Sequence, residues 1–295
     1  MQNLKTLKIL VIMIISFSAG AALLGIFSKD GHEKYEFTSI HGEKVIIYNN
    51  GLYRHMSADV AIQGIAQDCV TLIIAIPFLW YAFRQARKGS EAGKYLLAGV
   101  LGYFLVTYLF YLAMAMYNQM FLVYALLLCL SFFSFLITVL QIDYTKAVTI
   151  FSGLKLMRRS AIFLIANSIF IASLWLSIVV PPLISRTIYP KEIKHYTTLI
   201  VQGFDLGLFL PLAFVSGFLA LKNNRFGLAF TPVYIIFLSF LMTALCSKLL
   251  FMALAGVNVI PAVFIIPVIT IAAIIFSVLL LGRMKYHLTK TIDTI

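Results

Sequence analysis

The chain has 295 residues, of which 62% are hydrophobic and 12% are charged, and its net charge is +12. Water-soluble domains are close to half apolar and a quarter charged, so this composition excludes an ordinary soluble domain and is typical of a protein that crosses a membrane several times. We assign the cationic excess to loops that orient such a protein in its membrane, and we expect no nucleic-acid partner.

Apolar stretches of about 20 residues follow one another along the chain, and each can cross a hydrocarbon core of about 30 Å as a helix. They lack the alternation of a membrane β-barrel, so we predict an all-α transmembrane helix bundle of about eight spans. The predicted spans are 7–27, 69–86, 95–117, 119–141, 159–184, 200–221, 227–255 and 258–281. No small-residue cleavage motif follows the first stretch, so we interpret it as a retained span and not as a signal peptide.

Residues 28–67, which we call the flap, form the extramembrane segment that is long enough to fold. Alternating apolar residues, with turn-forming residues at His41-Gly42 and Asn49-Asn50-Gly51, predict a small β-meander of two or three strands there. A sheet of two or three short strands is only marginally stable by itself. We therefore expect the flap to pack on the ends of the helices.

The positive charges predict the orientation of the chain. With the N-terminus inside, inner segments hold fifteen of the 23 cations and outer loops hold seven, which favours both termini in the cytoplasm. The inner cations are Lys5, Lys8, Arg84, Arg87, Lys88, Lys94, Lys146, Lys155, Arg158, Arg159, Lys222, Arg225, Arg283, Lys285 and Lys290; the outer ones are Lys29, Lys34, Lys44, Arg54, Arg186, Lys191 and Lys194.

The chain also resembles itself. Each half has a first span, an outer loop, a glutamine and an aspartate, a helix with an internal proline (Pro77, Pro211), a basic turn and a further helix. This order predicts a parallel 4+4 repeat, with units 1–150, which includes the flap, and 151–295. Apolar sequence of low complexity matches itself easily, so chance similarity is the alternative.

Asp68 and Asp205 are carboxylates at or inside apolar stretches. Counting back from Arg84 and Lys222 places both about one helical turn below the outer membrane surface. A charged carboxylate facing lipid there is unfavourable by about 1–3 kcal/mol, so each is expected to face the bundle. Lys248, inside the seventh span, is the natural cationic partner because its long side chain can reach the same level.

Two interpretations of these three charges remain open. In the first, they form an outward-facing polar binding site, because ionisable residues inside a membrane often mark binding sites or ion paths. In the second, they clamp three spans together, and each acid is stabilised by the positive N-terminal end of its helix. The remaining candidates for the binding site are Gln63, Gln67, Gln202, Tyr108, Tyr111 and Asn118.

The first interpretation gives the functional hypothesis: a multi-pass membrane protein that binds or transports a small cationic solute or ion. The alternative is a sensory or accessory membrane subunit whose outer flap docks a partner protein. No nucleotide-binding, zinc-protease or redox motif occurs, and no histidine lies in a span to activate a serine. We therefore expect no catalytic residue, cofactor or metal, and the lipid bilayer as the main surrounding partner.

Four stretches, "GLYRHMSADV…QDCVTL", "LAGVLGYFLVTYLFY", "YNQMFLVYALLLCLSFFSF" and "FDLGLFLPLAFVSGFLALKNN", carry a family resemblance. The chain resembles a family of bacterial polytopic membrane proteins whose activity is uncharacterised, and the resemblance covers most of its length. It implies a bacterial inner-membrane setting, and it brings no activity, cofactor or site residue.

Overall fold

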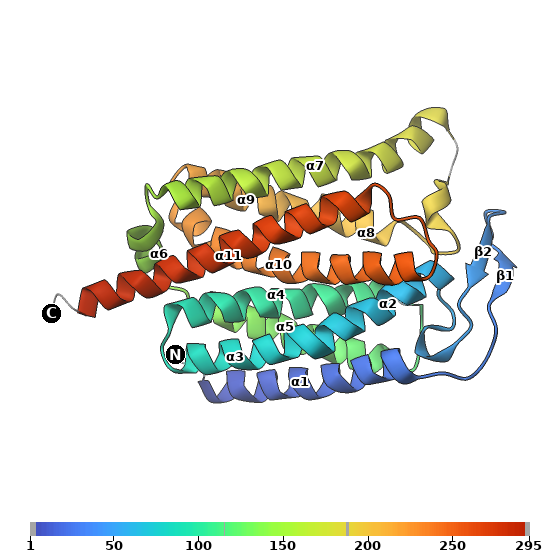
Figure 1. The fold of residues 1–295 in the computed structure, drawn as a ribbon, viewed down its shortest axis with the longest axis horizontal. Coiled ribbons are helices and arrows are strands. Elements are labelled where there is room, and N and C mark those ends of the chain that lie inside the picture. Colours follow the sequence, from blue (N-terminus) through green and yellow to red (C-terminus); the bar gives the residue numbers. More distant parts are fainter. Residues whose placement is uncertain (1–3, 115, 187–188, 293–295) are drawn as a thin grey trace.

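The computed structural model describes residues 4–114, 116–186 and 189–292, with side chains up to residue 285 (Figure 1). This part of the chain contains eight helices that are long and apolar enough to span a membrane, which confirms the predicted all-α bundle. The spans are α1 (Leu4–Phe27), α2 to α3 (Ala58–Arg87), α4 (Glu91–Met114), α5 (Phe121–Val139), α7 (Lys155–Ser185), α8 to α9 (Ile200–Leu221), α10 (Arg225–Leu254) and α11 (Ala262–Ile292). The chain is a multi-pass membrane protein.

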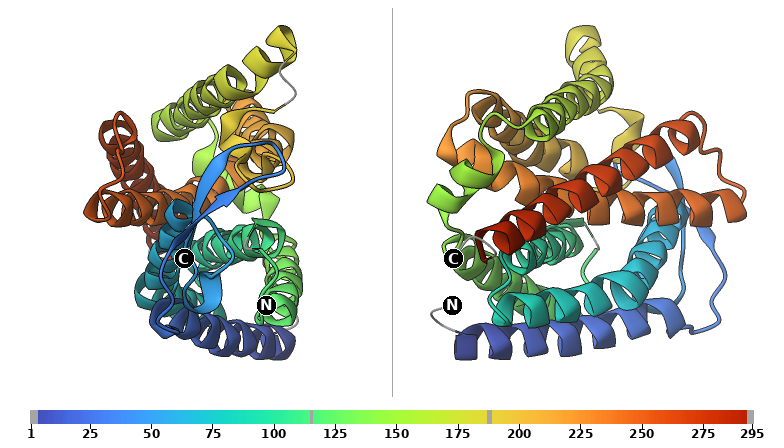
Figure 2. Two further views of the ribbon diagram at one scale, coloured as in Figure 1. Left: turned by 90° about the vertical axis from the view of Figure 1, so that its right-hand side faces the viewer. Right: turned by 60° about the vertical axis from the view of Figure 1, so that its left-hand side comes forward.

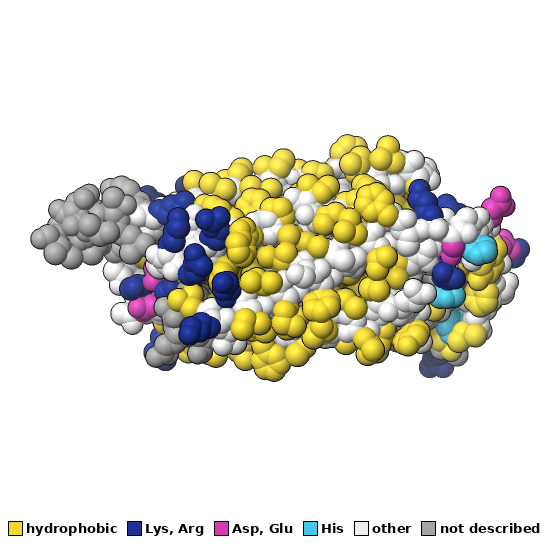
Figure 3. Space-filling view, turned by 90° about the horizontal axis from the view of Figure 1, so that it is seen from below, with side chains coloured by type: hydrophobic (Ala, Val, Ile, Leu, Met, Phe, Trp, Pro, Cys, Tyr) yellow, Lys and Arg dark blue, Asp and Glu magenta, His cyan; other side chains and the backbone are white. Residues whose placement is uncertain are grey.

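The surface shows how these helices meet a bilayer. On the face seen in Figure 3, apolar side chains form a broad band across the middle of the molecule, while charged side chains gather at its two ends. Helix α1 begins and α11 ends at one of these ends, which we call the basic end, and the β-hairpin lies at the other, which we call the flap end (Figure 1). At the basic end, Glu91 Oε1 accepts from Lys94 at 2.9 Å and from Lys146 at 3.3 Å. A short helix there, α6 (Tyr144–Phe151), was not predicted.

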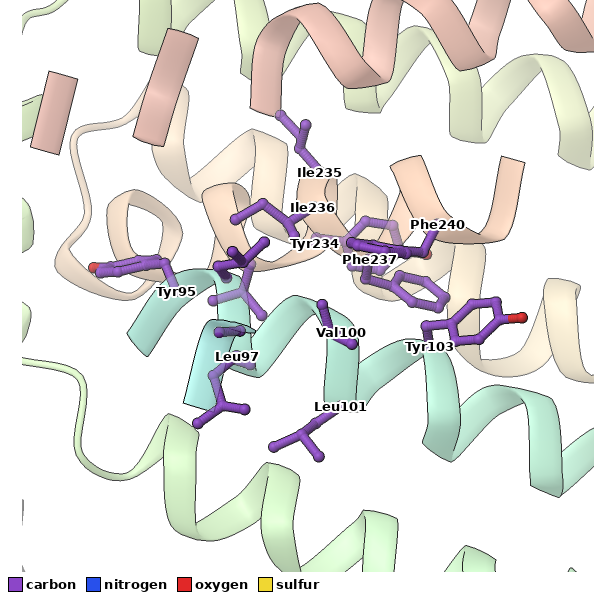
Figure 4. Packing of buried hydrophobic residues seen from close by; sticks show 14 of the residues in the cluster. Tyr95, Leu97, Val100, Leu101, Tyr103, Tyr234, Ile235, Ile236, Phe237 and Phe240 are labelled. Atoms are coloured by element: carbon purple, nitrogen blue, oxygen red, sulfur yellow. The ribbon is translucent and has the colours of Figure 1, made fainter. Parts of the chain in front are cut away.

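Helices α4 and α10 cross at the centre of the bundle. Ile236, Phe237 and Phe240 of α10 meet Val100 and Tyr103 of α4 in the core (Figure 4). The crossing is close because α4 presents a glycine: a Cβ at position 99 would overlap the side chain of Ile236. Small residues at helix contacts let membrane helices approach to van der Waals distance, which is a main source of their association in lipid.

Two helical hairpins have the same local construction. Helices α3 (Ile76–Arg87) and α9 (Leu210–Leu221) each contain 12 residues and carry proline at the second position. Each then reaches the next span through a tight turn with positive φ, at Gly89 in one hairpin and at Asn223 in the other. Gly93 and Gly227 follow, and a Cβ at either would overlap the backbone of the preceding helix. This equivalence supports an internal repeat, while the division into units 1–150 and 151–295 remains a prediction.

A five-residue π-helical segment precedes each proline helix: η2 (Thr71–Ala75) and η4 (Asp205–Phe209). Proline has no N–H and its ring crowds the preceding turn, so a local widening of the helix relieves the conflict. The predicted repeat treated Asp68 and Asp205 as equivalent positions of the two halves. Aligning the two halves on Pro77 and Pro211 shows that they are not equivalent. Asp68 lies three residues before η2, at the position of Gln202, whereas Asp205 opens η4, at the position of Thr71.

The flap is simpler than predicted. Strands β1 (Tyr35–Thr38) and β2 (Lys44–Ile47) form an antiparallel hairpin, which confirms two strands, and Val45 and Ile47 are both buried on one face of β2. The predicted third strand is instead the short 3₁₀ helix η1 (Gly51–Tyr53). Residues 58–67 belong to helix α2 (Ala58–Val70), so the second span begins about ten residues before its predicted start at 69.

The flap also contacts the other half of the chain. Its hairpin lies against the 189–196 segment, where His41 stacks on Tyr189 with ring centroids 3.6 Å apart. Tyr196 hydroxyl lies 3.3 Å from Ser57 Oγ, and Lys194 forms an ion pair with Asp59. Tyr53 and Met56 also pack with Ala61 of α2 and with Tyr111 of α4, so the flap packs on helix ends, as expected from its small size.

The two sets of four spans are packed to different extents. In the first half, α1 lies along α5, α2 and α3, while α4 is covered by α3 and α5 and, from the second half, by α10. In the second half, α7 packs mainly on α9, and α7 and α11 are splayed apart at the flap end (Figure 2). Within the most apolar stretch of each helix, 67% of residues are buried in α4 but only 17% in α7. The second half therefore leaves much of its apolar surface to lipid.

Candidate functional site

Asp68 lies on α2, in the first half of the chain, and is 2% exposed. Its Oδ2 accepts a hydrogen bond from the hydroxyl of Tyr53 at 2.5 Å, and its Oδ1 accepts one from the hydroxyl of Tyr111 at 2.8 Å. Helix α1 presses on the carboxylate from a third side, because a Cβ at Gly25 would overlap Asp68 Oδ2. The carboxylate is therefore held by two phenols and one glycine backbone from three different elements.

Four tyrosines surround this carboxylate, and we call them the tyrosine cluster: Tyr53, Tyr108, Tyr111 and Tyr124. The rings of Tyr111 and Tyr124 meet edge to face at 5.2 Å, and those of Tyr108 and Tyr111 do so at 5.8 Å. Each edge-to-face pair of this kind stabilises the fold by about 0.5–1.5 kcal/mol beyond the contribution of its buried area. These contacts therefore help to hold the four rings in place around Asp68.

A second group of polar side chains lies next to Asp68, on the side of the middle of the bundle. Gln67 Nε2 donates to Tyr103 hydroxyl at 2.9 Å and to Thr107 Oγ1 at 3.0 Å, and Thr71 Oγ1 lies 2.9 Å from Tyr103 hydroxyl. Gln67 is 3% exposed, and its Oε1 has no hydrogen-bond partner among the residues that the structure describes. The polar groups of α2 and α4 thus continue from Asp68 toward the middle of the bundle.

Lys248 of α10 is the cationic group associated with Asp68. Its neighbour Ser247 donates to the carbonyl of Ala66 at 3.2 Å, which brings this part of α10 beside α2. The charges of Lys248 and Asp68 attract each other, but within the described residues Lys248 makes no ion pair at 4.0 Å or less. The predicted pairing of these two residues is therefore present as an attraction at longer distance.

The cost of burial explains why Asp68 has several partners. Moving one carboxylate out of water costs several kcal/mol even after the protein relaxes. Hydrogen bonds to a charged acceptor are about twice as strong as neutral ones, so two tyrosine donors offset much of this cost. Lys248 adds a favourable charge interaction, since a low dielectric screens it weakly. The predicted helix-dipole explanation is wrong for Asp68, because α2 begins ten residues earlier, at Ala58.

Asp205 belongs to a different group of residues. It is half-buried, and its Oδ2 accepts a hydrogen bond from Trp175 Nε1 of α7 at 2.7 Å. Its other electrostatic neighbour is Tyr234, whose hydroxyl donates to the carbonyl of Phe209 at 2.7 Å. The structure thus brings Lys248 toward Asp68, while the partners of Asp205 are Trp175 of α7 and Tyr234 of α10.

The remaining predicted residues have separate places. Tyr108 is 2% exposed and belongs to the tyrosine cluster. Gln63 and Gln202 are half-buried on α2 and α8. Asn118 lies in the turn between α4 and α5, where its Oδ1 accepts from the backbone N–H of Met120 at 2.8 Å. The structure therefore gathers Asp68, Gln67, Tyr108 and Tyr111 in one place, and Asn118, at the start of α5, interacts with Tyr124 of the tyrosine cluster.

Several residues of the site were missed by the sequence analysis: Gly25, Tyr53, Thr71, Tyr103, Thr107, Tyr124 and Trp175. One signal was present, because Tyr103, Thr107 and Tyr111 recur every four residues and so share one face of α4. Tyr53 was assigned to a surface strand, and nothing in the sequence links Tyr124 of α5 to Asp68 of α2. These two residues meet only through tertiary packing.

No protein-family model, curated protein or solved structure matches this chain.

Proposed function

We propose that this membrane protein binds a small cation at Asp68, and that the cation is a proton. The observation that supports this is the arrangement of the carboxylate: both oxygens accept a tyrosine hydroxyl, and the backbone of Gly25 lies directly against one of them. A hydrated metal ion or an amine needs space beside the carboxylate, whereas a proton needs none. A buried carboxylate in a membrane span is a common proton carrier in pumps and transporters.

Lys248 is the internal counter-ion in this proposal. When Asp68 is charged, its attraction to Lys248 favours the close approach of α2 and α10. A proton on Asp68 removes this attraction and weakens both tyrosine hydrogen bonds, because a neutral carboxyl is a poorer acceptor. Protonation would therefore alter the contact between the two halves of the bundle, which is what proton-coupled transport of a solute requires.

The proposed setting is a bacterial inner membrane with both termini in the cytoplasm and the flap outside. Two observations support it: the excess of Lys and Arg on the segments at the basic end, and the family resemblance of the sequence. In this orientation the tyrosine cluster lies in the outer half of the membrane.

Infrared difference spectroscopy of the protein in proteoliposomes tests the proton site. Stepping the pH should produce a carboxylic-acid C=O band that is absent in Asp68→Asn and is altered by Tyr111→Phe, because the phenol hydrogen-bonds that carboxyl. Asp205→Asn is the matched control, since it removes a carboxylate that has a different partner. A full set of bands in Asp68→Asn would contradict the proposal.

The second candidate function is a sensory or accessory subunit that docks a partner through the flap. It is favoured by the apolar side chains that the hairpin presents to water: Ile40 is 93% exposed, Ile46 48% and Tyr35 46%. Exposed apolar groups of this kind often mark interaction surfaces. A photoreactive residue placed at Ile40 should cross-link one protein in native membranes. The same probe at Ile260, which is 66% exposed in another loop at the flap end, should not. Equal labelling from both positions would contradict specific docking.

A further inference from the structure

A pocket of about 570 Å³ opens at the flap end, outside the Asp68 site. It lies between the end of α1, the η1 turn of the flap and the corner that joins α4 to α5. Tyr53 follows Leu52 in the η1 turn and points away from the pocket toward Asp68, whereas Leu52 and Arg54 line the pocket. The pocket is therefore adjacent to the proposed proton site but is built from different residues.

One side of the pocket carries a positive excess. Arg54 Nη2 pairs with Asp30 Oδ2 at 3.0 Å, and Arg54 Nε donates to the carbonyl of Gly51 at 3.3 Å. A guanidinium has further N–H donors, which remain available for a ligand. Lys29 also lines the pocket, and within the described residues no ion pair occupies its ammonium group. Two cations against one carboxylate leave this side with a net positive charge.

Other residues that line the pocket are apolar, and we call them its apolar side. Leu24 of α1 and Phe121 and Leu122 of α5 line it, and they are 46%, 38% and 77% exposed. Helix α1 ends at Phe27 and α5 begins at Phe121, so these residues mark the ends of two membrane spans. A pocket at that level has its apolar side against the hydrocarbon and its charged side against the headgroup region.

We propose that this pocket binds an anionic amphiphile. Its phosphate or carboxylate head contacts Lys29 and Arg54, and the first part of its acyl chain lies along Leu24, Phe121 and Leu122. An arginine held in place by Asp30 and the Gly51 carbonyl is well suited to such a head, because a planar guanidinium binds oxyanions through paired hydrogen bonds. The assignment does not depend on the proposed proton site, since none of these residues contacts Asp68.

Native mass spectrometry of the purified full-length protein in a non-ionic detergent tests this assignment. Oleoyl lysophosphatidic acid and oleoyl lysophosphatidylcholine are titrated separately, since they share a chain and differ in headgroup charge. We expect the anionic lipid to bind at least about tenfold more tightly, because it alone presents an uncompensated charge to Lys29 and Arg54. Equal affinities would overturn the assignment.

Matched variants examine each side of the pocket. Lys29→Gln should weaken lysophosphatidic acid about three- to fivefold, as expected for a partly exposed ion pair. Lys44→Gln, which removes a flap lysine that pairs with Glu36, should leave binding unchanged. Phe121→Ala should weaken binding severalfold through lost apolar contact. The control is Phe132→Ala, which truncates a similarly exposed ring on the same helix.

A competition experiment with inorganic phosphate distinguishes binding of an amphiphile from binding of a free anion. Inorganic phosphate at millimolar concentration should compete weakly, because it cannot use the apolar side. Full competition by phosphate together with unchanged binding in Phe121→Ala would mean that the pocket takes a free anion, which overturns the amphiphile. Unchanged binding in Lys29→Gln would overturn the role of the charged side.

Discussion

The two halves of this membrane protein share one helical hairpin but bury their acidic residues differently. Helices α3 and α9 have equal lengths, equal proline positions and a π-helical segment before each. In the first half, α1 closes over this unit, and Asp68 is 2% exposed with two tyrosine donors. In the second half, α7 turns outward, and Asp205 is half-buried with one indole donor. The comparison shows that the residues which reach each acid from other elements, and not the shared hairpin, decide how far a carboxylate is sealed.

The largest expected effect concerns the contact that seals the first half. Gly25→Ala should destabilise the protein by about 3 kcal/mol or more, because the new methyl group would overlap the carboxylate of Asp68, which is fixed by its hydrogen bonds. Thermal unfolding in detergent measures the loss. Gly20→Ala is the matched control on the same helix, since its methyl group would meet nothing within 4 Å. Equal stability of the two variants would show that α1 does not seal Asp68.

The equivalence of the hairpins predicts a pair of similar effects. Gly93→Ala and Gly227→Ala should each destabilise the protein by about 1–3 kcal/mol, since each methyl group would overlap the backbone of the preceding helix. Gly207→Ala, at an open position, should cost far less. The readout is again thermal unfolding. A large loss from one of the two glycines and none from the other would contradict the equivalence.

The donors to the two carboxylates should differ in importance. Tyr111→Phe should destabilise the protein by about 1.5–3 kcal/mol, because it removes a hydrogen bond to a sealed charged group. Trp175→Phe should cost less, about 1 kcal/mol, since half-buried Asp205 can exchange the indole for water. Tyr117→Phe, at a ring that is 80% exposed, provides the baseline. The reverse order would mean that Asp205 is the more tightly sealed acid.

The smallest effect concerns acid at the flap end of the first half. The backbone N–H of Gly51 lowers the pKa of Asp30, with Arg54 acting in the same direction. A lowered carboxyl pKa contributes stability that is fully present above the ordinary value and is lost as the pH falls through the lowered one. The Asp30–Arg54 pair should therefore persist at a pH where ordinary exposed carboxylates are protonated.

Proton exchange of the Gly51 amide during an acid titration can follow this pair. The wild-type amide should stay protected to a lower pH than expected for an ordinary aspartate. Asp30→Asn should abolish the pH dependence, because the amide that replaces the carboxyl does not titrate. A transition at the ordinary carboxyl pKa in the wild type would contradict the prediction.

The sequence predicted the spans well because lipid imposes a strict requirement. A backbone in hydrocarbon must satisfy its own hydrogen bonds, so each long apolar stretch is a helix. The start of the second span was wrong for a physical reason: "ADVAIQGIAQD" contains polar residues that hydropathy assigns to water. Other helices bury Gln67 and Asp68, so this part of α2 needs no apolar sequence. The sequence also predicted the attraction between Lys248 and Asp68. That prediction used only the positions of the two residues along their spans, since residues at a similar depth in a helix bundle can meet.

The sequence by itself determined that this chain lies in a membrane and how many times it crosses, since both depend on composition and on the length of each apolar segment. The tertiary structure decided which acid is sealed. Tyr53, Tyr111 and Gly25 surround Asp68 from the flap, α4 and α1, and Trp175 reaches Asp205 from α7. Such contacts join residues far apart in the chain, and they depend on how each flanking helix packs, which no local pattern encodes.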